Sequence, residues 1–192
     1  RCRAGPWGRR RVSDPWANGR LDRDNPVHQR LVDDPHYHQL AGIPRASLWA
    51  PLSEVCSAGE IELLAAVRRW ADNGSAGMLY LGAWPDPLAR FRAITGGLVR
   101  GEVDARLRTL RQLREAQDEA ASCSVLVIPN LSLADAPDKV TRQVVGDLLV
   151  SRAMRAKPTI AAVESLEQIR LAYGATPAQY LRDNYTVLMG GS

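Results

Sequence analysis

The stretch GMLYLGAWPDPLARFRAI, which runs from Gly77 to Ile94, combines an apolar run, a glycine turn and a proline that can start a helix. Its first part, MLYL, is a short apolar run that ends in a turn at Gly82. An apolar run without polar alternation is typical of a strand that is buried on both faces of a sheet. Pro87 suits the first turn of a helix, because its fixed φ fits a helix and its missing N–H is not needed there. The stretch therefore predicts a buried strand, a glycine turn and a helix.

Three more apolar runs follow along the chain, at 124–131 (SVLVIPNL), 157–164 (KPTIAAVE) and 185–190 (YTVLMG). The first two are continuous rather than alternating, as in a parallel sheet that is covered on both faces. Segments with helical patterns separate the runs, and strands that alternate with helices are typical of an α/β domain. The sequence therefore predicts an α/β fold with a mainly parallel sheet of about four or five strands flanked by helices.

The other elements are predicted from caps, glycines and prolines. Helices are expected at 60–71, from Pro87 to the Gly96–Gly97 pair, at 104–121, after Pro137, up to Gly174, and from a Thr176 cap with Pro177 in the first position. The segment 98–103 (LVRGEV) is expected to be a strand. Residues 1–44 are predicted to form an irregular arm rich in Arg and Pro, with a short helix or two, and residues 45–192 the α/β domain.

The composition is that of a soluble globular protein, with 192 residues of which 45% are hydrophobic and 24% charged. No apolar run approaches the roughly 18–20 residues that a membrane helix needs. Cys2, Cys56 and Cys123 are far apart and form no disulfide framework, which predicts a reducing, cytoplasmic location. No set of metal ligands is expected within the chain, although Cys2 could end a zinc ribbon whose other cysteines lie upstream.

The net charge is +4, and the basic residues are concentrated in two places. The first eleven residues carry five arginines and no acid, which favours non-specific attraction to polyanions. Arg90 and Arg92, together with Arg100, are expected to form a second basic patch at an edge of the sheet. The candidate nucleic-acid contacts are therefore Arg1, Arg3, Arg9, Arg10, Arg11, Arg90 and Arg92.

The turn after Leu81 stands where a phosphate-binding loop would stand. Such a loop uses glycines to bring backbone N–H groups to the phosphates, a Lys for the outer phosphates and a Ser or Thr for Mg²⁺. This turn has one glycine, no Lys and no hydroxyl, while Trp84 adds bulk and two prolines lack the N–H. The degenerate phosphate loop consists of Gly82, Ala83, Trp84, Pro85, Asp86, Pro87 and Leu88.

Two other positions of an ATPase site are altered as well. A Walker B strand ends in acids that hold Mg²⁺ and activate water, but Pro129 and Asn130 follow the run VLVI here. A sensor position usually carries Thr or Asn near the end of a later strand, where this chain has Val163 and Glu164. Glu164 is either a displaced catalytic acid or, as we favour, a solvated or helix-capping residue.

Several segments together resemble the bacterial helicase-loader ATPases of the DnaC/IstB group. They are LAGIPRASL, IELLAAVRRWADNGSAGMLYLG, SVLVIPNLS, VVGDLLVSRAMRAKPTIAAVES and LRDNYTVLMGGS, in the order of that group, across residues 40–192. The resemblance implies an AAA+ (P-loop NTPase) fold and a DNA-replication accessory protein that acts with the replicative helicase and single-stranded DNA. It matches Gly82 to the first glycine of the Walker A loop. It also implies that Arg152 or Arg182 faces a neighbouring subunit, like an arginine finger.

The apolar segments that match this family are present, whereas the Walker A, Walker B and sensor positions are all altered. We therefore predict a non-catalytic AAA+-like protein that binds a replicative helicase or an active ATPase homologue and no cofactor. Two alternatives stay open. One is an active ATP-dependent loader with displaced residues such as Glu164 and Arg90, and the other is a generic α/β interaction module with a basic nucleic-acid-binding tail.

Overall fold

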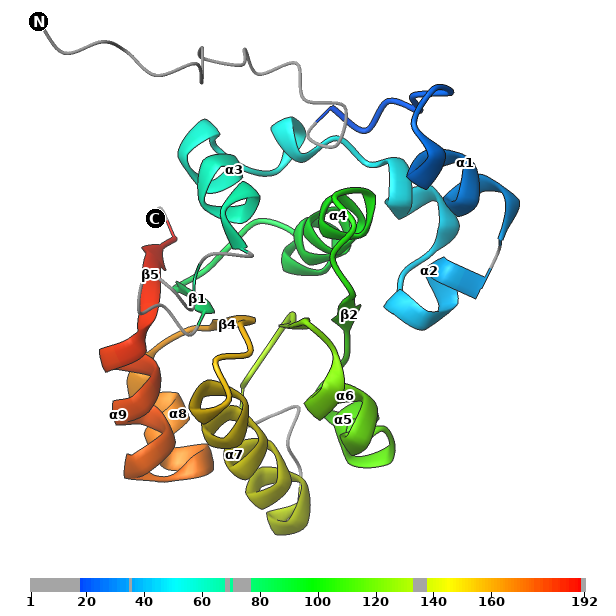
Figure 1. The fold of residues 1–192 in the computed structure, drawn as a ribbon. Coiled ribbons are helices and arrows are strands. Elements are labelled where there is room, and N and C mark those ends of the chain that lie inside the picture. The colour runs from blue at the N-terminus through cyan, green and yellow to red at the C-terminus, as the bar shows by residue number, and fades with distance from the viewer. Residues whose placement is uncertain (1–17, 35, 68–69, 71–76, 133–137, 191–192) are drawn as a thin grey trace, which may run out of the picture.

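The computed structural model describes residues 18–34, 36–67, 70, 77–132 and 138–190. Its centre is one five-stranded sheet in the order β2-β3-β4-β1-β5, and all neighbouring strands are parallel (Figure 1). The strands are β1 (Gly77–Leu81), β2 (Ala105–Leu107), β3 (Val125–Ile128), β4 (Thr159–Val163) and β5 (Tyr185–Met189). This arrangement confirms the predicted α/β fold with a parallel sheet.

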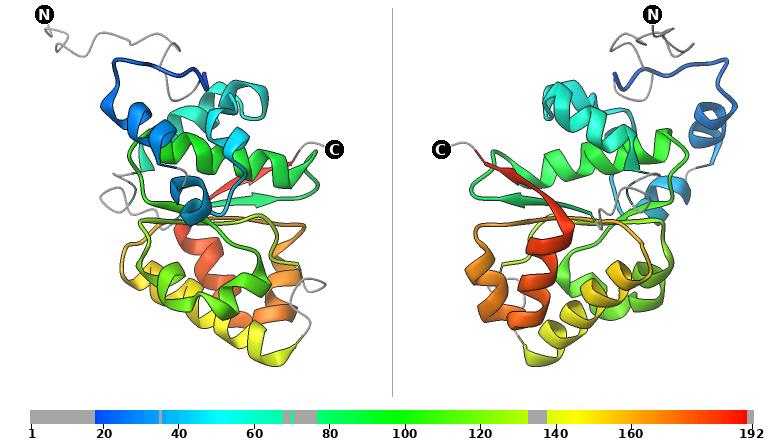
Figure 2. Two further views of the ribbon diagram at one scale, coloured as in Figure 1. Left: turned by 90° about the vertical axis from the view of Figure 1, so that its right-hand side faces the viewer. Right: turned by 60° about the vertical axis from the view of Figure 1, so that its left-hand side comes forward.

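Helices cover both faces of the sheet, as the two views of Figure 2 show. One face carries α3 (Ala58–Ala65) and α4 (Pro87–Arg100). The other face carries α5 (Leu110–Glu115), α6 (Gln117–Ser122), α7 (Lys139–Met154), α8 (Leu166–Tyr173) and α9 (Ala175–Asn184). Side chains alternate between the two faces along each strand, so Met78 and Tyr80 join the core under α4, whereas Leu79 and Leu81 join the core under α7.

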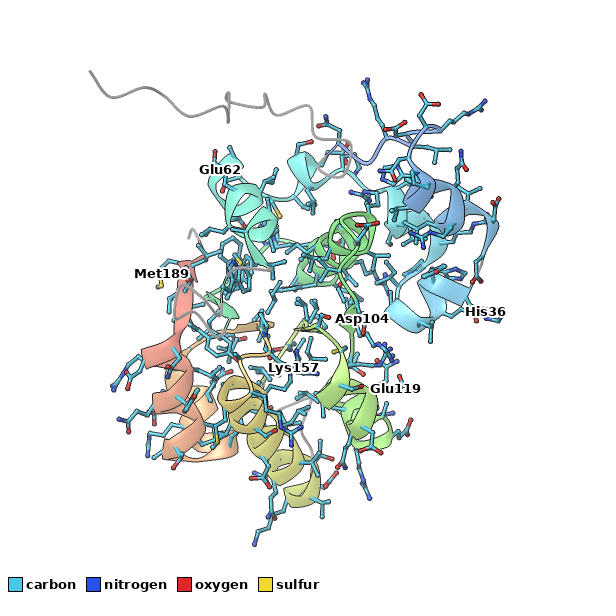
Figure 3. The ribbon with its side chains drawn as sticks, in the orientation of Figure 1. His36, Glu62, Asp104, Glu119, Lys157 and Met189 are labelled. Carbon is cyan, nitrogen blue, oxygen red and sulfur yellow. The ribbon has the colours of Figure 1, made fainter. Side chains whose placement is uncertain are left out.

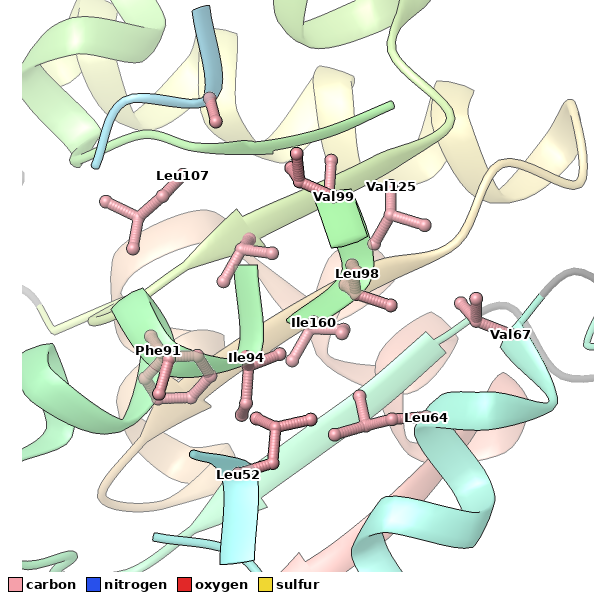
Figure 4. Packing of buried hydrophobic residues seen from close by; sticks show 14 of the residues in the cluster. Leu52, Leu64, Val67, Phe91, Ile94, Leu98, Val99, Leu107, Val125 and Ile160 are labelled. Carbon is pink, nitrogen blue, oxygen red and sulfur yellow. The ribbon is translucent and has the colours of Figure 1, made fainter. Parts of the chain in front are cut away.

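The helix after the turn is longer than its sequence predicts. It was expected to stop at Gly96 and Gly97, but α4 continues to Arg100. A Cβ at Gly96 would lie 2.1 Å from the carbonyl oxygen of Ser47, so this glycine permits close packing instead of ending the helix. Leu98 belongs to the apolar face of α4 (Figure 4), and the strand predicted at 98–103 is wrong.

The single long helix predicted at 104–121 is also wrong. Ala105 and Leu107 are buried on either side of the half-buried Arg106, which is the period of two that a strand requires, and they form β2. Thr109 then starts α5 with a capping box, because its hydroxyl accepts from the Gln112 N–H and the Gln112 side chain accepts from the Thr109 N–H. The segment is therefore one strand and two short helices.

The predicted start of α9 is shifted as well. The helix begins at Ala175, directly after Gly174, whose φ of +96° lies in the left-handed region. Thr176 and Pro177 therefore lie inside the first turn, where the missing N–H of Pro177 has no intrahelical acceptor to lose. The final strand is confirmed, and α3 starts with a capping box between Ser57 and Glu60.

The segment before α3 packs against α4 and β2. It contains α1 (Pro26–Asp33), α2 (His36–Ala41), and the 3₁₀ helices η1 (Arg45–Trp49) and η2 (Leu52–Glu54). Leu31, Ala41 and Ile43 are buried in the same core as α4. Along the described ranges of the chain, no helix has the length and apolar character that would let it cross a membrane.

His28 fixes α1 to the residues before it. The ring is buried, its Nδ1 accepts a hydrogen bond of 3.0 Å from the Asp22 N–H, and it packs edge-to-face on Trp49 with centroids 5.3 Å apart. Burial and the nearby Arg100 guanidinium lower the pKa of His28 from its ordinary 6.5, and Asp22 opposes them. The folded protein therefore favours the neutral form of this imidazole.

Acidification below the ordinary pKa of 6.5 is expected to destabilise the protein through His28. The unfolded chain takes up the proton first, so the unfolding free energy falls with pH until the folded-state pKa is passed. Urea unfolding at about pH 7.5 and about pH 5.5 would measure this, with His28→Asn as the test variant and the exposed His36→Asn as its control. Equal pH-dependent losses in the wild type and in His28→Asn would contradict it.

Candidate functional site at the carboxyl edge of the sheet

The three altered ATPase positions meet at one edge of the sheet. β1 and β4 are parallel neighbours with Leu81 beside Val163, and the Gly82 N–H donates to the carbonyls of Val163 and Glu164 at 3.1 and 3.2 Å. The segment after β3 joins them, because the Leu131 N–H donates to the Ala162 carbonyl at 2.8 Å. β1 lies between β4 and β5, and the crevice outside such strand ends is where parallel α/β sheets bind ligands.

The start of α4 is occupied by a carboxylate of the chain itself. Asp86 has a left-handed φ of +36°, and its Oδ1 accepts a hydrogen bond of 3.0 Å from the Ala89 N–H. Pro87 is the first residue of the helix and has no N–H to offer. In a phosphate loop, free N–H groups at this helix end would bind phosphate oxygens. Here Asp86 already supplies the anion.

The Trp84 ring packs into the turn. Its Nε1 donates to the Leu81 carbonyl at 3.2 Å, and its ring lies edge-to-face on Tyr80 with centroids 5.0 Å apart. The end of β5 closes against it, because a Cβ at Gly190 would lie 2.6 Å from the Ala83 carbonyl oxygen and 3.0 Å from Trp84 Nε1. The turn therefore packs against β1 and against the end of β5.

The outer surface of the turn is exposed and mostly apolar. Ala83, Pro85, Asp86, Pro87 and Leu88 are all exposed. Met189, labelled in Figure 3 near the end of β5, is 70% exposed. A cavity of about 810 Å³ lies elsewhere, between α7 and the α8–α9 pair, and none of the altered ATPase positions lines it.

Arg90 is held inside the structure. Its Nη1 lies 2.7 Å from Glu60 Oε1, and the two side chains are only 13% and 9% exposed. Its guanidinium also lies over the Trp84 ring, 4.7 Å from the centroid. Arg90 is thus an internal ion-pair partner, which differs from the exposed nucleic-acid contact that the sequence suggested.

The basic patch predicted from Arg90, Arg92 and Arg100 is not formed. Arg100 is buried at the far end of α4, where its guanidinium donates to the carbonyls of Leu48 and Ala50, and burial lowers its pKa to about 10. Ten residues of helix place it about 15 Å along the axis from Arg90. Arg92 is partly buried between them.

The residues at the positions that would hold Mg²⁺ and position water bond to neighbouring side chains or are buried. The exposed Asn130 side chain accepts from the Ser132 N–H at 2.9 Å and donates to the Ser132 hydroxyl at 3.1 Å. Glu164 is exposed and accepts from the Gln168 amide, whereas Pro129 and Val163 are buried. Within the described residues, no group of three His, Cys, Asp or Glu side chains is arranged to hold a metal ion.

The two candidate subunit-facing arginines lie in different surroundings. Arg152 is buried at 1% exposure, where it donates to the carbonyls of Ala120, Cys123 and Pro158. It faces the interior and presents no surface to a neighbouring subunit. Arg182 is exposed on α9 and bonds Asp183 at 2.9 Å. The five arginines of residues 1–11 lie outside the described residues.

Comparisons with known proteins agree with this topology. No family model matches the chain, and no curated protein sequence matches it. Among solved structures, DnaI is similar with a TM-score of 0.56 and 18% identity, over 78% of this chain and 93% of DnaI. The chain shares the fold of DnaI.

A second solved structure has the same likeness. A protein from Streptococcus pyogenes serotype M3, provisionally described as a primosome component, matches with a TM-score of 0.54 and 14% identity, over 79% of this chain and 91% of its own. These likenesses establish the shared fold and confirm the resemblance that the ordered segments indicate. At 18% and 14% identity, these likenesses show the fold alone.

Proposed function

We propose that the chain is a non-catalytic AAA+-like accessory protein of DNA replication, of the helicase-loader type. The ordered family segments support this role, as does the fold shared with DnaI and with the primosome component. The chemistry expected of such a protein is binding, because the groups that hydrolyse ATP in this family are replaced at all three positions.

The observation that carries the proposal is the state of the turn at 82–88. The Asp86 carboxylate sits where a phosphate would be bound, and like charges this close repel one another. Pro85 and Pro87 remove two N–H donors, and Trp84 fills the turn from inside. A nucleotide would have to displace groups of the folded protein that already satisfy one another.

The proposed partner is a replicative helicase or an active AAA+ homologue. The altered turn offers it an apolar surface, with Pro85, Pro87 and Leu88 exposed. Of the two candidate subunit-facing arginines, Arg182 is exposed and can reach a neighbouring subunit, whereas Arg152 is buried. Single-stranded DNA is a proposed second ligand through the arginines of residues 1–11, which match a polyanion by charge.

Size-exclusion chromatography of the purified chain with the replicative helicase of its own organism tests this function. A complex is expected without added ATP, and Leu88→Glu is expected to weaken it because a charge would then be placed on the exposed turn. Leu171→Glu on α8 serves as the control, because Leu171 is 61% exposed against 37% for Leu88 and lies away from the turn. No complex with either a helicase or an AAA+ homologue would contradict the proposal.

The DNA-binding part has its own test. Replacing the five arginines of residues 1–11 by Gln is expected to lower the affinity for labelled single-stranded DNA. The slope of log K against log salt should shrink by up to about 3.5, at about 0.7 per lost phosphate contact. Replacing Arg170 and Arg182, which pair with their own neighbours, is the control. An unchanged affinity and slope would assign no electrostatic role to the arm.

A further inference from the structure

Arg90 joins three elements that surround the altered turn. It belongs to α4, pairs with Glu60 of α3 at 2.7 Å, and lies over the rings of Trp84 and Tyr80 at 4.7 and 5.9 Å from their centroids. Tyr80 belongs to β1, and its ring packs edge-to-face on both Trp84 and Phe91. One guanidinium therefore links the turn to a helix that lies about thirty residues earlier in the chain.

Glu60 uses both of its oxygens in this arrangement. Its Oε1 accepts from Arg90, and its Oε2 accepts from the Ser57 N–H at 2.8 Å in the capping box that starts α3. A carboxylate with two donors is fixed in direction, so it holds Arg90 against the aromatic rings. The chain of contacts runs from the start of α3, through Glu60 and Arg90, to Trp84 of the turn.

The surroundings make this pair stronger than a surface ion pair. Both side chains are almost excluded from water, so the attraction between them is screened little. Arg90 Nε is buried and has no hydrogen-bond partner among the described residues. The position of the guanidinium therefore depends on Glu60 and on the two ring faces. Loss of either Glu60 or Arg90 leaves the other charge buried and uncompensated.

We propose that Glu60 and Arg90 form a latch that holds the turn at 82–88 in its present conformation without a ligand. In this account the latch does for the turn what bound phosphate does for a phosphate loop. The inference deepens the proposed non-catalytic role and rests on it, because a turn held by protein groups presents a fixed surface to a partner in the absence of nucleotide.

Hydrogen exchange of the full chain without nucleotide, followed by mass spectrometry, tests the latch. Arg90→Met keeps the packing of the stem and removes the charge, and Glu60→Gln keeps the shape and removes the opposite charge. Each is expected to speed exchange in the peptide that covers 82–90 by roughly tenfold and to leave the β3 peptide unchanged. Arg170→Met, which breaks the exposed Arg170–Glu167 pair, is expected to change neither peptide.

Unchanged exchange at 82–90 in both variants would overturn the latch. Equal acceleration in the 82–90 and β3 peptides would also overturn it, since the pair would then stabilise the whole domain rather than the turn. If Arg90→Met does not fold, the isosteric Glu60→Gln decides between these results. The exchange experiment contains no nucleotide, so its result does not depend on nucleotide binding. The proposed function is tested separately, and Mg²⁺-dependent nucleotide binding to the wild type would contradict it.

Discussion

Replacing Arg152 by Met is expected to lower the free energy of unfolding by about 3 kcal/mol. The guanidinium donates to the carbonyls of Ala120, Cys123 and Pro158 at 2.6, 3.1 and 2.7 Å, and its Nε donates to the Thr159 hydroxyl at 3.1 Å. These acceptors lie at the end of α6 and at the amino ends of β3 and β4. The variant leaves buried acceptors unpaired, and each costs about 1–3 kcal/mol.

Part of that loss is offset, since burial lowers the pKa of Arg152 and the variant removes a charge that is costly to bury. Urea unfolding of Arg152→Met against Arg155→Met measures the difference, because Arg155 lies at the end of the same helix and is exposed. A loss below about 1 kcal/mol for Arg152→Met would mean that water replaces the guanidinium at these carbonyls.

Gly96→Ala is expected to destabilise the protein by about 2–3 kcal/mol, although Ala favours a helix by about 1 kcal/mol over Gly. The new Cβ would lie 2.1 Å from the Ser47 carbonyl oxygen and 3.1 Å from the Leu48 Cα, and both are backbone atoms of η1. Either α4 or η1 would have to move, which would disturb the core around Leu52 and Ile94 (Figure 4).

The expected loss of stability is opposite in sign to the gain that helix propensity alone predicts for Gly96→Ala. Gly59→Ala in α3 is the control, because a Cβ there meets nothing within 4 Å, and it should be neutral or stabilising by up to about 0.5 kcal/mol. Thermal and urea unfolding of the two variants give the comparison. A stabilising Gly96→Ala would show that α4 and η1 are less closely packed than the structure has them.

Local patterns predicted the parts of the fold in which burial dominates. The runs at β1, β3 and β4 are continuous and apolar, and β5 is a short, mostly apolar run, so the four strands were predicted close to their real positions. β2 was missed because it has only three residues and carries Arg106 at its centre. The Gly96–Gly97 pair was taken as a helix end because glycine has low helix propensity, whereas its real role depends on η1, nearly fifty residues earlier in the chain.

The sequence placed the candidate residues at one edge of the sheet, but it did not predict their side-chain contacts. Parallel strands carry their carboxyl ends to one edge, so the gathering of the turn, Asn130 and Glu164 follows from the strand pattern. The Glu60–Arg90 pair spans thirty residues and has no local signature. The burial of Arg152 could not be predicted either, because the family motif gives its position in the sequence but not the direction of its side chain.

Titration of the purified chain with Mg²⁺ and an ATP analogue that is not hydrolysed would show whether the turn at 82–88 binds a nucleotide. A site with a Kd of one hundredth of the free ligand concentration would stabilise the fold by about 2.7 kcal/mol. We predict no saturable heat of binding, no shift of the unfolding transition at about 1 mM analogue and no slowed exchange at 82–90. Saturable, Mg²⁺-dependent binding that protects the turn would rule out a non-catalytic turn and favour an active loader that uses Glu164 and Arg90.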